Sequence, residues 1–360
     1  MKTFILTLFT LLAAYCKAQD AIYDLSYENR LLLNPAFCGG NGEGVIKTSL
    51  FHHNIYGTLR GPFHNTSASI DYLFCETNIA VGMIVQNETQ GDGNLTLNTV
   101  SPVIGIPIVL GSNLLLSFGL QADLINQNID WSRLIFSDQI SPMQGVVQQS
   151  SNTNPTLLNK YAYCINSGFN LIGKHRTPMF IRKHQYEGYG KYKWNIGIAL
   201  NHIYSSPIGL LSTNSFIPMS LTVHGGFIVE KYEKTIDGSF EFTARFDQQP
   251  LFNSQDINNT LILNTKYYFN SYFSMGVGYR PNSFNHDVWR NSRSMMIHAG
   301  IIPTKSDNLK IDLCYAVSIG ELGFANAFEI GLIIFSPKRC SGPNTSTDLY
   351  NKDRKKNMSF

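Results

Sequence analysis

The hydrophobic and polar positions of this chain alternate with a period of two in one segment after another. The clearest example is 114–124, where the even-numbered residues are apolar and the odd-numbered residues, apart from Leu115, are small or polar. A strand of about ten residues with one apolar face can cross a bilayer when its neighbours close into a barrel. Strands of soluble sandwich proteins are usually only about five or six residues long. The alternation therefore predicts membrane-spanning β-strands.

The same pattern predicts an all-β fold, a transmembrane antiparallel β-barrel of about 14 strands. The expected strands are, approximately, 45–56, 65–75, 78–88, 94–105, 113–124, 161–173, 193–204, 219–231, 238–247, 258–269, 271–281, 293–303, 309–319 and 325–335. Single-chain outer-membrane barrels have an even number of strands. A secreted β-sandwich, or two in tandem, would also alternate, but the strand length and the Leu-, Ile- and Phe-rich outer faces favour the barrel.

The faces opposite the apolar ones carry polar and charged side chains, which predicts a hydrated lumen, because such side chains are costly when they face lipid. The charged residues on these faces are Asp71, Asp123, Glu241, Arg245, Asp312 and Glu329. The connections are uneven in length. Short links at 75–78 and 270–271 are expected on the periplasmic side, whereas the long polar segments 125–160 and 174–192 are expected as loops on the outer side.

The two ends of the chain differ from the strands. Residues 1–18 combine a positive charge at Lys2, an apolar stretch and a small-residue cleavage site, which predicts a secretory signal peptide. Residues 19–44 lack a strand pattern and are expected to form a loop that can plug the lumen. The barrel is expected to occupy 45–335, followed by a polar basic tail at 336–360, with no second globular domain.

The composition agrees with a barrel in the outer membrane. Removal of residues 1–18 leaves 26 basic residues (28 less Lys2 and Lys17) against 25 acidic ones, and this balance argues against nucleic acid as a partner. Only 15% of the residues are charged, while 18 are Tyr and 23 are Phe. That combination suits a barrel whose outer face meets outer-membrane lipid and whose rims carry aromatic side chains.

Candidate chemistry is sparse, and no catalytic, cofactor or metal site is expected. His52 and His53 are adjacent on a predicted strand and therefore point to opposite faces, so they cannot chelate one ion together. The five cysteines after residue 18 show no CxxC spacing, which indicates neither a disulfide framework nor a zinc site. A bridge between Cys38 and Cys340 and a set of small buried side chains are the two interpretations of these cysteines.

Short motifs follow one another along most of residues 19–335. They are 33–40 (Leu-Asn-Pro-Ala-Phe-Cys-Gly-Gly), 60–62 (Arg-Gly-Pro) leading into 66–72, 116–120 (Leu-Ser-Phe-Gly-Leu), 130–132 (Asp-Trp-Ser), 195–202, 276–280 (Gly-Val-Gly-Tyr-Arg) and 328–331 (Phe-Glu-Ile-Gly). The motif residues singled out as structural or family positions are Asn34, Pro35, Ala36, Gly39, Gly61, Pro62, Gly119, Trp131, Gly278, Tyr279, Arg280, Glu329 and Gly331. In this order and spacing the chain resembles the PorP/SprF family of Bacteroidetes, outer-membrane proteins tied to the type IX secretion system.

The resemblance implies a non-enzymatic role. Such proteins are similar to accessory barrels that help to export, or to retain at the cell surface, cargo with a type IX C-terminal sorting domain, including gliding adhesins. The implied partners are these surface proteins and the translocon and motor proteins of the secretion system. The competing hypothesis is an outer-membrane transport channel, either a diffusion porin or a carrier of hydrophobic compounds. A segment 19–44 that plugs the barrel would argue against free diffusion.

Overall fold

The computed structural model describes residues 23–55, 63–91, 95–110, 113–130, 133–134, 139–141, 145–146, 159–179, 188–208, 216–230, 237–248, 257–269, 272–281, 293–303, 308–319 and 326–336. The predicted signal peptide and the predicted tail after Ser336 lie outside these residues. Within the described ranges, no helix is both long and apolar enough to cross a membrane.

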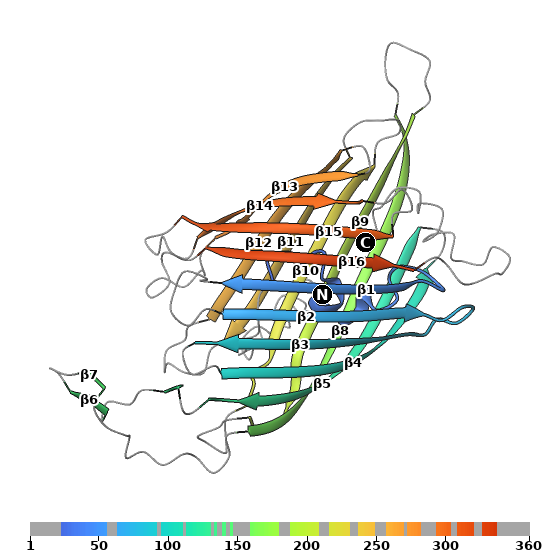
Figure 1. Ribbon diagram of the computed structural model, residues 1–360. Helices are drawn as coiled ribbons and strands as arrows, with labels where there is room; N and C mark the ends of the chain where they lie inside the picture. The colour runs from blue at the N-terminus through green and yellow to red at the C-terminus, as the bar shows by residue number, and fades with distance from the viewer. Residues whose placement is uncertain are drawn as a thin grey trace, which may run out of the picture.

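Fourteen antiparallel strands form one closed barrel, in the order β1-β16-β15-β14-β13-β12-β11-β10-β9-β8-β5-β4-β3-β2 (Figure 1). The barrel strands are β1 (Ile46–Ile55), β2 (Phe63–Leu73), β3 (Ala80–Gln90), β4 (Leu95–Leu110), β5 (Leu114–Asn128), β8 (Asn159–Met179), β9 (Gly188–Ser205), β10 (Ser220–Glu230), β11 (Asp237–Gln248), β12 (Ile257–Phe269), β13 (Phe273–Arg280), β14 (Ser294–Ile301), β15 (Leu309–Ser318) and β16 (Ala327–Phe335). A separate two-stranded sheet joins β6 (Ile140–Ser141) and β7 (Gly145–Val146). The predicted fold class and strand number are confirmed.

The period-two alternation produces the two faces of the barrel wall. On β4, Ile104, Ile106 and Ile108 are exposed on the outside, whereas Val103 and Gly105 are buried on the inside. Exposed large apolar side chains recur in this way around the barrel. A belt of this kind is the surface that a barrel presents to lipid. β1 pairs with both β2 and β16, so the first and last strands close the sheet.

The two rims of the barrel carry different connections. β1 begins and β16 ends at the same rim, because Lys47 pairs with Phe335; we call it the terminal rim, and the opposite one the loop rim. Since the strands alternate in direction, β2 and β12 end at the terminal rim, where β3 and β13 begin, whereas β5 ends and β8 begins at the loop rim.

The prediction that 174–192 is a loop is wrong for 174–179 and 188–192, which are strand, while 180–187 lie outside the described residues. β8 continues to Met179 and β9 begins at Gly188, so the two strands stay paired through most of this segment. β8 ends and β9 begins at the terminal rim, opposite to the rim where β5 ends. Figure 1 shows the pair projecting beyond its neighbours as a green hairpin. The sequence here is polar at most positions, so the alternation that marks a strand inside the apolar belt is lost.

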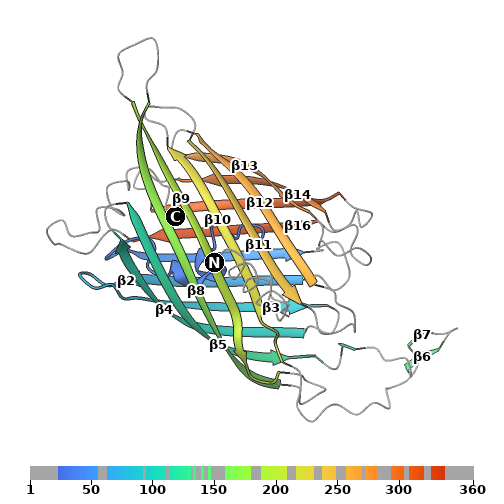
Figure 2. The same cartoon turned by 180° about the vertical axis from the view of Figure 1, so that it is seen from behind.

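Residues 23–44, here called the N-terminal segment, run inside the barrel (Figure 2). The segment contains the short helix α2 (Arg30–Leu33) and the 3₁₀ turn η1 (Pro35–Phe37). Its apolar side chains pack in two places, each against inward-facing residues of the wall. Tyr23, Leu25 and Tyr27 join a cluster with residues of β1, β12 and β14–β16, and Leu31 and Cys38 join one with residues of β2–β4.

Three of the described cysteines are small buried side chains, as the second interpretation holds, and the fourth is not. Cys38, Cys164 and Cys314 are buried free thiols, so a bridge between Cys38 and Cys340 is wrong. Cys38 lies instead in the apolar cluster between the N-terminal segment and β2–β4, where burial raises the pKa of its thiol. Cys75 is disulfide-bonded.

Candidate functional site

The Asn-Pro-Ala element forms a tight turn by local chemistry. The Asn34 side chain accepts a hydrogen bond from the Ala36 amide at 2.8 Å, and Pro35 occupies the first position of η1. Asn is a favoured cap, and proline at the first helical position loses no hydrogen bond, because that amide has no partner within the helix. The shape of this turn is therefore specified by its own residues.

A row of small residues on the wall receives the turn. Gly105, Gly119 and Gly168 are direct partners in the register of β4, β5 and β8. A Cβ at Gly105 would lie 2.7 Å from the Cys38 carbonyl oxygen, and a Cβ at Gly119 would overlap the Pro35 carbonyl group. Glycine is required here because the backbone of the segment touches the backbone of the sheet.

Asn34 also anchors the turn to three strands. Its Nδ2 donates to the carbonyl oxygens of Phe169 at 3.1 Å and Ile198 at 3.3 Å. The same nitrogen lies 2.9 Å from Nε2 of His224, which accepts. Asn34 is completely buried, so these bonds replace the water that its amide would otherwise bind. The side chain thus shapes its own turn and fixes it to β8, β9 and β10.

Gly39 completes the element on the other side of the turn. Its φ is +73°, and a Cβ would lie 2.5 Å from the Cβ of Ala80. The Gly39 amide donates to Asp71 Oδ2 at 3.0 Å. Asp71, predicted to face a hydrated lumen, thus accepts a hydrogen bond from the N-terminal segment. Both the left-handed backbone and the close approach to β3 require glycine at this position.

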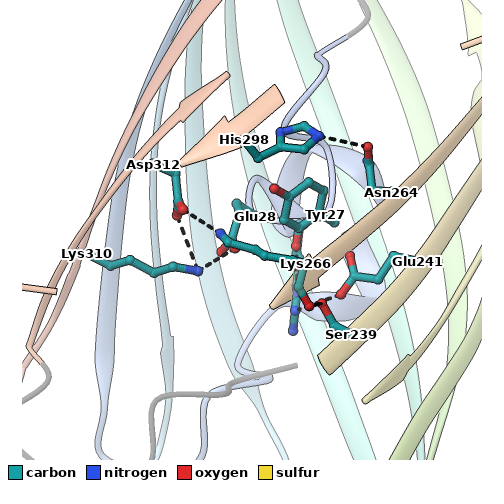
Figure 3. Close-up of polar contacts among 10 residues, drawn as sticks. Tyr27, Glu28, Ser239, Glu241, Asn264, Lys266, His298, Lys310 and Asp312 are labelled. Carbon is teal, nitrogen blue, oxygen red and sulfur yellow. Dashed lines mark hydrogen bonds and ion pairs between the residues drawn. The ribbon is translucent and has the colours of Figure 1, made fainter. Parts of the chain in front are cut away.

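A buried charge cluster holds the middle of the segment. Glu28 accepts a hydrogen bond from Lys266 at 3.0 Å and another from Lys310, and Lys266 also donates to Asp312 at 2.5 Å (Figure 3). Two carboxylates and two ammonium groups make the cluster neutral. Burial raises the pKa of the Glu28 carboxyl, but the two lysines outweigh that effect and lower it. Glu28 therefore stays ionised and ties the segment to β12 and β15.

A second polar cluster holds the start of the segment. Asp24 accepts from Arg280 Nη1 at 2.8 Å, and the Asp24 amide donates to Glu329 at 2.7 Å. His53 Nε2 lies 3.4 Å from Asp24 Oδ2. Although burial raises the pKa of Asp24, the charge of Arg280 and the contact with His53 lower it to about 2. This cluster attaches the segment to β1, β13 and β16.

The depressed pKa of Asp24 makes the attachment sensitive to acid. Because the carboxyl has a pKa of about 2 when the segment is in place and 3.8 ordinarily, its contribution is complete above about pH 4 and is lost as the pH falls towards 2. The contribution corresponds to about 2 kcal/mol. We expect hydrogen exchange in residues 23–33, corrected for the intrinsic rate at each pH, to accelerate over this range. The change Asp24→Asn should remove part of that acceleration, and the Glu28 carboxyl, whose pKa is also lowered in the folded protein, accounts for the rest.

Most of the motif residues meet around the N-terminal segment. Asn34, Pro35, Ala36 and Gly39 lie in it, Gly119 lies beneath it, and Arg280 and Glu329 hold Asp24. Gly278 and Gly331 face inward, where a Cβ would meet Asn264 and Phe51 respectively, while Tyr279 faces outward. Gly61, Pro62 and Trp131 lie outside the described residues.

Several residues that hold the segment were not singled out from the sequence. They are Asp24, Glu28, His53, His224, Lys266 and Lys310. Lys266 and Lys310 do fall on inward positions of predicted strands, so their place in the lumen could have been inferred. Their partner Glu28 lies in a segment without periodicity, and no spacing connects the three.

A cavity of about 60 Å³ remains between the N-terminal segment and β9–β12. It is lined by Tyr23, Ser26, Asn29, Leu32 and Leu33 of the segment and by Asn201, Thr222, Thr243, Thr260 and Ile262 of the wall. The segment therefore occupies the lumen without filling it. The wall side of the cavity carries hydroxyl and amide groups and no charged side chain.

Comparison with known proteins gives a family match and several similar folds. The family described as type IX secretion system membrane protein PorP/SprF matches residues 15–333. Among solved structures, the chain is similar to the monoaromatic hydrocarbon channel CymD (12% identity, 90% of this chain, 97% of that one, TM-score 0.42). It is also similar to an outer membrane protein of Acinetobacter baumannii (8%, 82%, 99%, 0.39) and to the toluene transporter TodX of P. putida (12%, 89%, 94%, 0.38). A search of the curated proteins found no match.

Proposed function

Because the chain belongs to the PorP/SprF family of type IX secretion system membrane proteins, we propose that it is a non-enzymatic docking component of that system in the outer membrane. It aids the export or surface attachment of cargo with a C-terminal sorting domain, such as gliding adhesins. Cargo binds at the loop rim, and translocon or motor proteins bind at the terminal rim. The exposed apolar belt, facing outer-membrane lipid, fixes the barrel between them.

The observation that carries this proposal is the N-terminal segment inside the barrel. Its ion pairs and hydrogen bonds join it to β1, β12, β13, β15 and β16, and its glycine contacts join it to β4, β5 and β8. An open diffusion pore needs a continuous hydrated lumen. A segment that is held by buried charges on one side and packed on glycine on the other favours a platform over such a pore.

The experiment that tests the proposal is a pull-down of the tagged protein from detergent-solubilised outer membranes, followed by identification of the co-purifying proteins. We expect type IX translocon or motor components, or a large surface protein with a sorting domain. Recovery of the barrel alone, together with free ion conduction in a planar bilayer, would contradict the docking role.

The alternative function, a transport channel, is favoured by the cavity beside the segment. Removal of residues 19–44 is expected to raise the single-channel conductance of the barrel in a planar bilayer by at least about tenfold, because the lumen of a barrel of this size is wide enough for ions. If the protein is a docking platform, the intact chain should conduct few ions. High conductance of the intact protein, unchanged by the deletion, would favour the channel over the platform.

The projecting β8–β9 hairpin supports a docking surface at the terminal rim. Beyond Gly173, the last residue of β8 with a partner at the start of β5, six further positions of β8 pair with β9, an extension of about 20 Å. The sequence 174–192 contains five Lys or Arg residues and one Glu. Short turns of exported barrels face the periplasm. We therefore propose that this basic stretch meets an acidic surface of a periplasmic partner.

Neutralising the hairpin tests this placement. Replacing Lys174, Arg176 and Lys191 by Gln is expected to reduce the co-purification of periplasmic secretion proteins at least about fivefold, because electrostatic complementarity governs such encounters. The matched control is Lys160→Gln, at the other end of β8. Equal loss in the control, or no loss in the hairpin variant, would contradict the assignment.

A further inference from the structure

Three ligand-type atoms converge where the N-terminal segment meets the closing seam of the barrel. Asp24 Oδ2, His53 Nε2 and Glu329 Oε1 belong to residues whose ligand atoms all lie within 4.8 Å of one another. They come from the segment, from β1 and from β16, and His53 pairs directly with Glu329 in the register of the seam. All three residues are at most 1% exposed.

None of these three atoms has a hydrogen-bond partner among the described residues. Buried polar atoms are nearly always hydrogen-bonded, so three that lack a hydrogen bond at a single point need an explanation. A protonated His53 between two carboxylates would make short charge-assisted bonds of about 2.7–2.9 Å. The separation of 3.4 Å between His53 Nε2 and Asp24 Oδ2 is longer than that.

The other oxygen of each carboxylate already accepts hydrogen bonds. Asp24 Oδ1 accepts from Arg280 at 2.8 Å, and Glu329 Oε2 accepts from the amides of Asp24 at 2.7 Å and Leu25 at 3.0 Å. These bonds fix both carboxylates and leave Asp24 Oδ2 and Glu329 Oε1 without a hydrogen bond. Outer partners of this kind orient the ligands of metal sites.

We propose that Asp24, His53 and Glu329 bind a divalent transition-metal ion, with Zn²⁺ preferred. Two ligands at about 2.1 Å from a tetrahedral ion lie about 3.4 Å apart, the separation found between the Asp24 oxygen and the His53 nitrogen. Imidazole favours Zn²⁺ over Mg²⁺ and Ca²⁺, which prefer oxygen ligands alone. Three protein ligands leave the fourth position to water. The ion joins the N-terminal segment to the first and last strands of the barrel.

The test uses the full-length protein with its affinity tag removed, stripped with a chelator and titrated with Zn²⁺ and, separately, Mg²⁺ by calorimetry. We expect one Zn²⁺ per chain and no binding of Mg²⁺ at the same concentration. His53→Gln and Glu329→Gln should each weaken Zn²⁺ binding at least about 100-fold, and Arg280→Gln, which removes an outer partner, about 10–100-fold. The matched control is His298→Gln, since His298 is buried on β14 and bonded to Asn264.

Absence of Zn²⁺ binding by the intact chain would overturn the proposal, as would unchanged binding in His53→Gln and Glu329→Gln, or equal loss in the control. If those variants do not fold, X-ray absorption of the Zn²⁺-loaded intact protein decides. It should show one imidazole and otherwise oxygen ligands at about 2.0–2.2 Å. A sulfur ligand would overturn the assignment, because Cys314 pairs with Glu329 on the neighbouring strand.

Discussion

Replacing Glu28 by Gln is expected to release the N-terminal segment from the barrel. The carboxylate is buried between Lys266 and Lys310, so the change leaves two ammonium groups with only Asp312 to balance them. Breaking a buried pair from one side costs about 3–5 kcal/mol, because an uncompensated charge remains in a medium of low polarity. That cost should fall on the attachment of the segment, since both lysines belong to the wall.

The measurement is trypsin cleavage after Arg30, which is 11% exposed in the intact structure. Cleavage should accelerate more than about 100-fold in Glu28→Gln, the factor to which a loss of this size corresponds. The double change Glu28→Gln with Lys310→Met should restore most of the protection, because it leaves one lysine paired with Asp312. Glu43→Gln makes the same charge change elsewhere in the segment and should have little effect. Equal rates in Glu28→Gln and Glu43→Gln would contradict the role of the cluster.

The sequence predicted the wall of this barrel well, for a physical reason. A strand that separates lipid from an enclosed lumen must alternate at every step, so the pattern marks both its length and its faces. The expected strands 309–319 and 325–335 match β15 (Leu309–Ser318) and β16 (Ala327–Phe335) closely. Because the pattern requires a face that meets lipid, it is lost at 174–192, where the strands project beyond the lipid belt.

The contents of the lumen could be predicted only in part. Asn34 and Pro35 indicate a capped turn, because the interactions that form it are local. The ion pairs of Glu28 join residues 238 and 282 positions apart in the chain. The alternation predicts which side chains of a strand face inward. It does not predict which of these side chains the N-terminal segment contacts, because that segment has no periodicity. His53 was interpreted only beside His52, whereas its neighbours in space are Asp24 and Glu329.

Replacing Gly119 by Val is expected to expel the Asn-Pro-Ala turn while leaving the barrel folded. A Cβ at this position would overlap the backbone of Pro35, which cannot move aside as the end of a flexible side chain can. Overpacking of this kind costs about 1–3 kcal/mol or more. Valine suits a strand, so β5 itself should tolerate the change.

The separation of these two effects is what the experiment must establish. The folded mobility of the barrel on a gel without heating should be unchanged, while trypsin cleavage after Arg30 accelerates about tenfold or more, since about 1.4 kcal/mol corresponds to a factor of ten. The control is Ala122→Val, which adds the same side chain on the outward face of the same strand. Its barrel and its segment should both behave as in the unaltered protein. Loss of the folded barrel in Gly119→Val alone would mean that the glycine serves the wall, and that the turn is held by Asn34 and the charge clusters without it.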